Sequence, residues 1–180
     1  MTIDPSIQLA GRILVTLIFG MALVGKLRHR EEFVGVVANY RLLPEALVVP
    51  VAWLIIVLEG VVVLSLGSAI QLAAGAAVAA LLLGSFALAM AINVRRGRVE
   101  IDCGCFQSAL RQRLSGALVI RNLVLIAVTV PLLKGEPAQV SSWQMFNGIA
   151  AGILLFVLYQ VLDQLLALRE SAAALRRRFT

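Results

Sequence analysis

Five long apolar stretches limit the folds open to this chain more than any other feature of its sequence. A helix needs roughly 20 apolar residues to cross the hydrocarbon core of a bilayer. Stretches of about that length cover residues 7–25, 46–66, 69–92, 114–133 and 145–166. Because a backbone in lipid must satisfy its own hydrogen bonds, each stretch is predicted to be an α-helix. The sequence therefore predicts an all-α, polytopic membrane bundle of four to five transmembrane helices.

The composition agrees with a membrane protein. Hydrophobic residues make up 61% of the 180 residues and charged residues only 14%, whereas soluble domains are about a quarter charged. The formal net charge of +6 suits nucleic acid in some proteins, but the basic residues here flank the apolar stretches. That placement indicates membrane orientation and no nucleic-acid partner. We expect one bundle over residues 1–168 and a basic C-terminal tail over 169–180.

The connections between the stretches carry their own signals. In residues 26–45, Phe33, Val37 and Tyr40 recur at helical spacing, which predicts a short amphipathic helix at the membrane interface. Gly67 and Ser68 predict a tight hairpin between the second and third stretches. The many Ala and Gly residues of the third stretch would let a neighbouring helix approach closely.

Cys103-Gly104-Cys105-Phe106 lies in the polar connection between the third and fourth stretches and holds the chain's only two cysteines. A disulfide across one residue closes a very small ring, which glycine can accommodate. Strained disulfides are more labile than structural ones, so this spacing favours redox exchange. The alternatives are a structural pair or an incidental one. A structural zinc site needs four ligands, and the single histidine, His29, lies in another connection, so no metal is predicted.

Several polar residues lie within or beside the apolar stretches. Glu59 is costly at its depth, which marks either a functional group or a protonated carboxyl bonded to a neighbouring helix. Arg121 either snorkels to headgroups or stabilises a cysteine thiolate. Asp163 and Gln160 are interpreted as contacts within the bundle or as residues of the membrane interface. The residues expected to frame a pocket around the cysteine pair, or to support it, are Lys26, Tyr40, Glu59, Asn93, Arg96, Gly104, Phe106, Arg121 and Asn122.

Orientation follows from the distribution of Lys and Arg. With five spans, the connections over residues 26–45 and 93–113 and the C-terminal tail share one side. That side carries nearly all of the basic residues, and the other side carries only Arg12 and Lys134. The positive-inside rule predicts a cytoplasmic cysteine connection.

Through a set of residues spread along the chain, the sequence resembles the MauE family of methylamine utilisation proteins, which is related to DoxX-type membrane proteins. The residues that carry the resemblance are Gly25-Lys26, Phe33, Tyr40 to Pro44, Glu59, Asn93, Arg96-Gly97, Cys103 to Phe106, Ser115 and Arg121-Asn122. The Cys-Gly-Cys-Phe element is the most specific of them. Gln107 departs from the family pattern, in which a glycine follows the phenylalanine.

The resemblance implies a multi-pass protein of the inner membrane that takes part in maturing the methylamine dehydrogenase small subunit. Cys103 and Cys105 would exchange with a thioredoxin-like, MauD-like partner, which acts on the small subunit in the periplasm. That role favours a periplasmic cysteine connection, against the charge count. A membrane quinone as acceptor would make the protein an oxidase, and a cytoplasmic thioredoxin as donor would make it a reducing conduit. The alternatives are a non-catalytic assembly or export factor, or a small-molecule transporter with Glu59 as its ion site.

Overall fold

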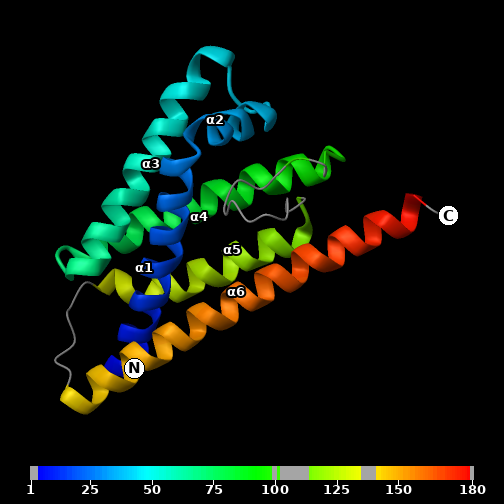
Figure 1. Ribbon diagram of the computed structural model, residues 1–180. Helices are drawn as coiled ribbons and strands as arrows, with labels where there is room; N and C mark the ends of the chain where they lie inside the picture. Colours follow the sequence, from blue (N-terminus) through cyan, green and yellow to red (C-terminus); the bar gives the residue numbers. More distant parts are fainter. Residues whose placement is uncertain (1–3, 99–100, 102–113, 135–140, 179–180) are drawn as a thin grey trace.

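The computed structural model describes residues 4–98, 101, 114–134 and 141–178, with side chains to residue 169. Cys103, Gly104, Cys105 and Phe106 lie outside the described residues. The helices, in chain order, are α1 (Pro5–Arg28), α2 (Arg30–Asn39), α3 (Glu45–Ser68), α4 (Leu72–Arg95), α5 (Gly116–Thr129), the 3-10 helix η1 (Val130–Lys134) and α6 (Ser142–Arg178) (Figure 1). The described residues contain no strand.

The prediction of a polytopic helical bundle is confirmed. Five helical segments are long and apolar enough to cross a membrane, and each contains or closely matches one predicted stretch: Pro5–Arg28, Glu45–Ser68, Leu72–Arg95, Gly116–Lys134 and Ser142–Arg169. Helix α6 continues to Arg178, so the basic tail begins within a helix. Large apolar side chains such as Leu64 and Leu81, which are 72% and 70% exposed, would face lipid.

The first helix begins with a side-chain cap. Asp4 is the N-cap residue and accepts a hydrogen bond of 2.8 Å from the Ser6 amide, and Pro5 occupies the first helical position. Hydrogen bonds from the Ser6 hydroxyl and amide hold the pKa of Asp4 below its ordinary value. This cap fixes where the first span starts.

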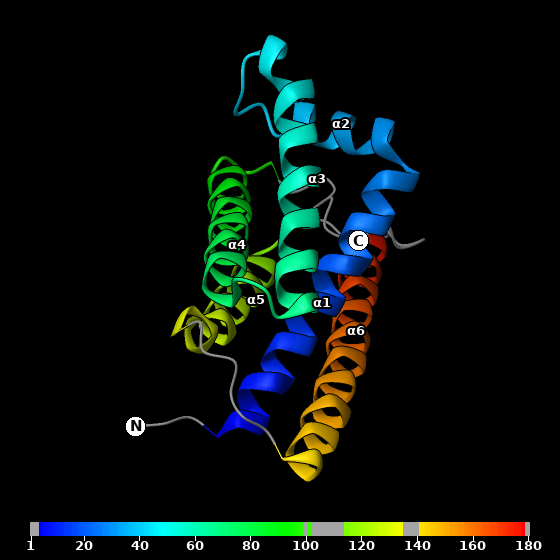
Figure 2. The same ribbon diagram turned by 90° about the vertical axis from the view of Figure 1, so that its left-hand side faces the viewer.

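Helix α2 confirms the predicted short helix after the first span. It follows the end of α1 and packs against the side of α3 (Figure 2). Its Phe33 is buried with Ala52 and Ile56 of α3, while Val34 and Val37 pack around them. This apolar face attaches α2 to the bundle, and its polar residues, including Glu31 and Glu32, remain exposed.

The hairpin between α3 and α4 differs from its prediction. Gly67 and Ser68 belong to α3, and the turn is made by Ala69 and Gln71, both in the left-handed region with φ of 60° and 52°. The close approach expected from the small residues is present at Gly75, where an added Cβ would lie 2.7 Å from Ser65 Cβ. The two helices therefore touch almost backbone to backbone beside the turn.

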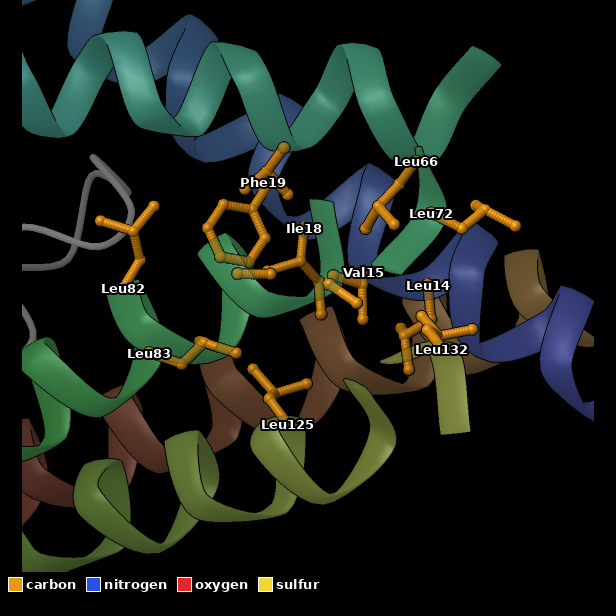
Figure 3. Packing of buried hydrophobic residues seen from close by; sticks show 13 residues of the cluster. Leu14, Val15, Ile18, Phe19, Leu66, Leu72, Leu82, Leu83, Leu125 and Leu132 are labelled. Atoms are coloured by element: carbon orange, nitrogen blue, oxygen red, sulfur yellow. The ribbon is translucent and has the colours of Figure 1, made fainter. Parts of the chain in front are cut away.

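The main core lies where α1, α3, α4 and α5 meet. Leu14, Val15, Ile18 and Phe19 of α1 contact leucines of the other three helices (Figure 3).

The bundle has two ends. At the cysteine end, α1 and α4 finish and α3 and α5 begin, so the connection that contains the cysteines starts and finishes there. The opposite end holds the start of α1, the α3–α4 turn, η1 and the start of α6 (Figure 1).

Candidate functional site

A buried ion pair joins α1 to α3 near the cysteine end. Lys26 Nζ donates to Glu59 Oε1 at 2.7 Å, and the two side chains are only 4% and 1% exposed. The Lys26 side chain extends into the bundle. The structure places a basic side chain on the Glu59 carboxyl group, so the neighbouring helix that Glu59 bonds to is α1.

Two aromatic rings complete the surroundings of this ammonium. Lys26 Nζ lies 5.1 Å from the ring centroid of Phe33 and 5.8 Å from that of Phe86. Both distances lie within the range of cation–π attraction. The rings come from α2 and α4, so the cation is contacted by three helices besides its own.

A second ion pair joins α5 to α6. Arg121 Nη1 donates to Asp163 Oδ1, with the two side chains 10% and 11% exposed. The guanidinium carbon also lies 5.8 Å from the ring centroid of Tyr159. The prediction that Asp163 makes a contact within the bundle is confirmed, as it is for Gln160, whose Nε2 donates to Met21 Sδ at 2.9 Å.

A small cavity lies between the two ion pairs. It has a volume of about 30 Å³, and its polar lining comes from Lys26, Glu59, Arg121, Asn122 and Tyr159. That volume suits one water molecule, which needs two to four polar partners. It is far below the roughly 300–1,000 Å³ of pockets that hold small molecules. As described, the site beside Glu59 therefore has room for water and none for a quinone ring.

Two buried asparagines lie at the same end. Asn93 is fully buried and donates to the Ala89 carbonyl at 3.1 Å, and Asn122 donates to the Leu118 carbonyl at 3.2 Å. Both bonds run within their own helices. The pocket residues predicted at Asn93 and Asn122 are thus buried polar groups beside the connection that contains the cysteines.

Arg98, and not Arg96, makes the described contacts where α4 ends. Arg96 is exposed as the C-cap residue. Arg98 donates to Asn93 Oδ1 at 3.5 Å and to the Asn39 carbonyl at 3.1 Å, which links α4 to the end of α2. The structure therefore does not place Arg96 with the buried polar group.

The two ends of the cysteine connection meet. The Leu114 amide donates to the Ile101 carbonyl at 3.3 Å. Tyr40 and Ile101 pack on the buried side chains of Met90, Leu114 and Leu118. Tyr40 therefore lies near Ile101 and Leu114, where the connection starts and finishes. The position of the cysteine pair relative to Arg121 lies outside the described residues.

Sequence reasoning did not include four residues of this site in the pocket: Phe86, Arg98, Tyr159 and Asp163. Phe86 and Tyr159 could not be told from the other aromatic and aliphatic residues of their apolar stretches, because a cation–π contact leaves no periodic pattern in the sequence. Asp163 carried a signal, since a carboxylate in a span usually has a partner. The sequence did not identify the basic partner of Asp163, because that partner depends on which helix packs beside α6.

Comparison with known proteins agrees with the resemblance seen in the sequence. The model of the family described as methylamine utilisation protein MauE matches residues 5–135. The chain belongs to the MauE family. The match covers α1 to η1 and therefore includes Lys26, Glu59, the cysteine pair and Arg121.

Individual MauE proteins are similar over most of their length. The methylamine utilization protein MauE of Paracoccus denitrificans is 43% identical over 159 residues, which cover 87% of this chain and 86% of that protein. The Paracoccus versutus protein is 40% identical over 180 residues, which cover 97% of each chain. The Methylophilus methylotrophus protein is 36% identical over 167 residues, which cover 89% of this chain and 86% of that protein. No solved structure matches the chain significantly.

Proposed function

We propose that this protein is an inner-membrane thiol–disulfide exchange protein of methylamine utilisation, in which Cys103 and Cys105 form the reactive pair. The observation that carries the proposal is the Cys-Gly-Cys sequence in a connection whose ends, Ile101 and Leu114, are hydrogen bonded to each other at one end of a membrane bundle. Membership of the MauE family supports the link to methylamine utilisation.

The chemistry requires a thioredoxin-like partner with its own pair of cysteines. A thiolate of the reduced Cys103–Cys105 pair attacks the partner's disulfide, and one partner thiolate leaves. The second cysteine then attacks the mixed disulfide. The membrane pair ends as a disulfide and the partner as a dithiol, so two electrons and two protons move to the partner. The reverse sequence reduces the membrane pair, and the two reduction potentials set the direction.

The partner is proposed to be MauD-like and to act in turn on the small subunit of methylamine dehydrogenase. When the partner has reduced the membrane pair, reoxidation of the pair would need a further two-electron acceptor, for which a membrane quinone is the proposed class. In the opposite direction the membrane disulfide would need a donor of two electrons, such as a cytoplasmic thioredoxin. Because the cavity at Glu59 is only about 30 Å³, the quinone would have to reach the cysteines from outside this cavity.

A trapped mixed disulfide tests the proposal. The Cys103→Ser and Cys105→Ser variants each keep one thiol that can attack the partner's disulfide. The mixed disulfide that forms then persists, because the second cysteine that would resolve it is absent. We expect one of them to retain a thioredoxin-like protein in a complex that dissociates with reductant, while the double Ser variant retains none. Alkylation of the unmodified protein should count two more thiols after reduction. Two thiols that stay free under mild oxidant, with no trapped partner, would contradict the proposal.

The side on which the exchange occurs is tested by labelling. A membrane-impermeant maleimide added to intact spheroplasts would label reduced Cys103 and Cys105 if they face the periplasm, as the proposed partner requires. Protection from that reagent, with labelling only after lysis, would support the cytoplasmic location given by the positive-inside rule and would favour the reducing conduit.

A further inference from the structure

A groove of about 400 Å³ opens between α5–η1 and α6 at the opposite end of the bundle from the cysteine connection. Its back is formed by α1, through Gly11 and Leu14, and its sides by Leu132 of η1 and by Ala151 and Leu155 of α6. We call this the α5–α6 groove. Its described lining is almost entirely aliphatic.

Close contacts with α1 create the groove. An added Cβ at Gly11 would lie 3.2 Å from Val128 Cγ1 of α5, and one at Gly152 of α6 would lie 2.6 Å from Ile13 Cβ. Helix α1 thus touches α5 on one side and α6 on the other. From the Arg121–Asp163 pair, α5 and α6 diverge toward the opposite end (Figures 1 and 2). The space between them is not filled by side chains of the described residues.

The depth of the groove determines what medium reaches it. Its lining residues belong to helices that span the membrane, so the groove opens toward hydrocarbon. Among the described lining residues, the polar side chains are those of Ser6 and Gln8 of α1 and Asn147 of α6. Exposed Trp143, stacked on Phe146 with ring centroids 6.2 Å apart, marks the interface at this end, because aromatic residues concentrate at that depth.

These features select a lipid chain over water. Apolar cavities stay dry or take apolar ligands, since water finds few partners there. Side chains that border a void lose dispersion contacts, so a flexible chain that fills it restores them. The polar end of the groove offers amide groups from Gln8 and Asn147, which suit the ester region of a glycerolipid.

We propose that the α5–α6 groove is a binding site for one acyl chain of a membrane phospholipid. The chain runs along Gly11, Leu14, Ala151 and Leu155, with the glycerol esters level with Gln8 and Asn147. The lipid fills the wedge between the two helices, where the described residues form no ion pair between α5 and α6. This site is independent of the cysteine chemistry.

A groove-filling variant tests the site. Ala151→Phe places a ring in the groove, and Ala150→Phe places the same ring on the neighbouring exposed position of α6, outside the groove lining. After purification in mild detergent, phospholipid retained per protein is measured by mass spectrometry of extracted lipid. We expect at least a twofold loss for Ala151→Phe and no loss for Ala150→Phe. Equal retention in the two variants would overturn the proposal, as would an isoprenoid quinone as the retained lipid.

Photolabelling of the unmodified protein keeps the test independent of folding of the variants. A phospholipid with a diazirine at the end of its acyl chain is reconstituted with the protein, and the labelled peptides are mapped. We expect labelling of residues 6–14, 128–132 and 147–155 at least twofold above that of the exposed α4 surface at Leu81 and Leu88. Uniform labelling of both surfaces would contradict a specific site.

Discussion

The two ends of the bundle are held together by different forces. At the cysteine end, Lys26 pairs with Glu59 and Arg121 pairs with Asp163, so charges join α1 to α3 and α5 to α6. At the opposite end, glycines bring α1 against its neighbours through van der Waals contact. A charged side chain within a membrane is stable only where a partner group bonds to it. A glycine contact requires only that the surfaces of the two helices fit closely together. The polar end is therefore specified by partners and the opposite end by shape.

Arg12 is the exception at the opposite end, and its contacts support the comparison. Its Nε donates to the Leu66 carbonyl at 2.7 Å and its Nη2 to the Gly67 carbonyl at 3.2 Å. The Arg12 side chain caps the C-terminal carbonyls of α3, where a cation is favoured by the helix dipole. Among the described residues, even this charge bonds to backbone carbonyls and not to an acidic side chain.

The largest effect is expected from breaking the Lys26–Glu59 pair. Glu59→Gln or Lys26→Met leaves one buried charge without its partner, which costs about 3–5 kcal/mol of stability. The double variant Lys26→Met/Glu59→Leu removes both charges and should recover most of that loss. Thermal unfolding in detergent measures it, with exposed Glu45→Gln on the same helix as the control. Additive losses in the double variant would show that the pair does not act as a unit.

A smaller effect is expected from crowding the glycine contact at the opposite end. Gly152→Ala places a methyl group 2.6 Å from Ile13 Cβ and 3.0 Å from the Ala10 carbonyl oxygen, and such overpacking costs about 1–3 kcal/mol. Gly20→Ala in α1 has no atom within 4 Å of the added Cβ and should be neutral or slightly stabilising. The same unfolding assay compares them. If both variants unfold alike, α1 and α6 are not held by this contact.

The smallest effect concerns the influence of Arg121 on the proposed reactive thiols. Arg121→Ala should raise the apparent pKa of the more reactive cysteine, because a nearby cation favours the thiolate. Asp163→Asn should lower it, since it frees the Arg121 charge from its carboxylate partner. The alkylation rate of the reduced protein against pH measures both shifts. Superimposable curves for the two variants would limit Arg121 to holding α6.

Much of the fold was predictable because its signal is local. Each span is a property of about 20 consecutive residues, so hydropathy identified all five. The spacing of Phe33 and Tyr40 likewise identified α2. The Gly148 and Gly152 contact with α1 was missed, although Gly-x-x-x-Gly at these positions is a sequence signal for close helix packing. The hairpin was misplaced because Ala69 and Gln71, and not the preceding glycine, adopt the left-handed conformation.

The amino-acid sequence by itself determined that this chain is a membrane bundle, because apolar segments of this length have few other ways to avoid water. It also determined which charged side chains need a bonding partner within the membrane, including Lys26, Glu59 and Arg121. Only the tertiary structure decided their partners. Lys26 and Glu59 are 33 positions apart and Arg121 and Asp163 are 42 apart, and such pairs form according to which helices lie side by side. Pairing is a property of helix packing, and no local pattern in the sequence encodes it.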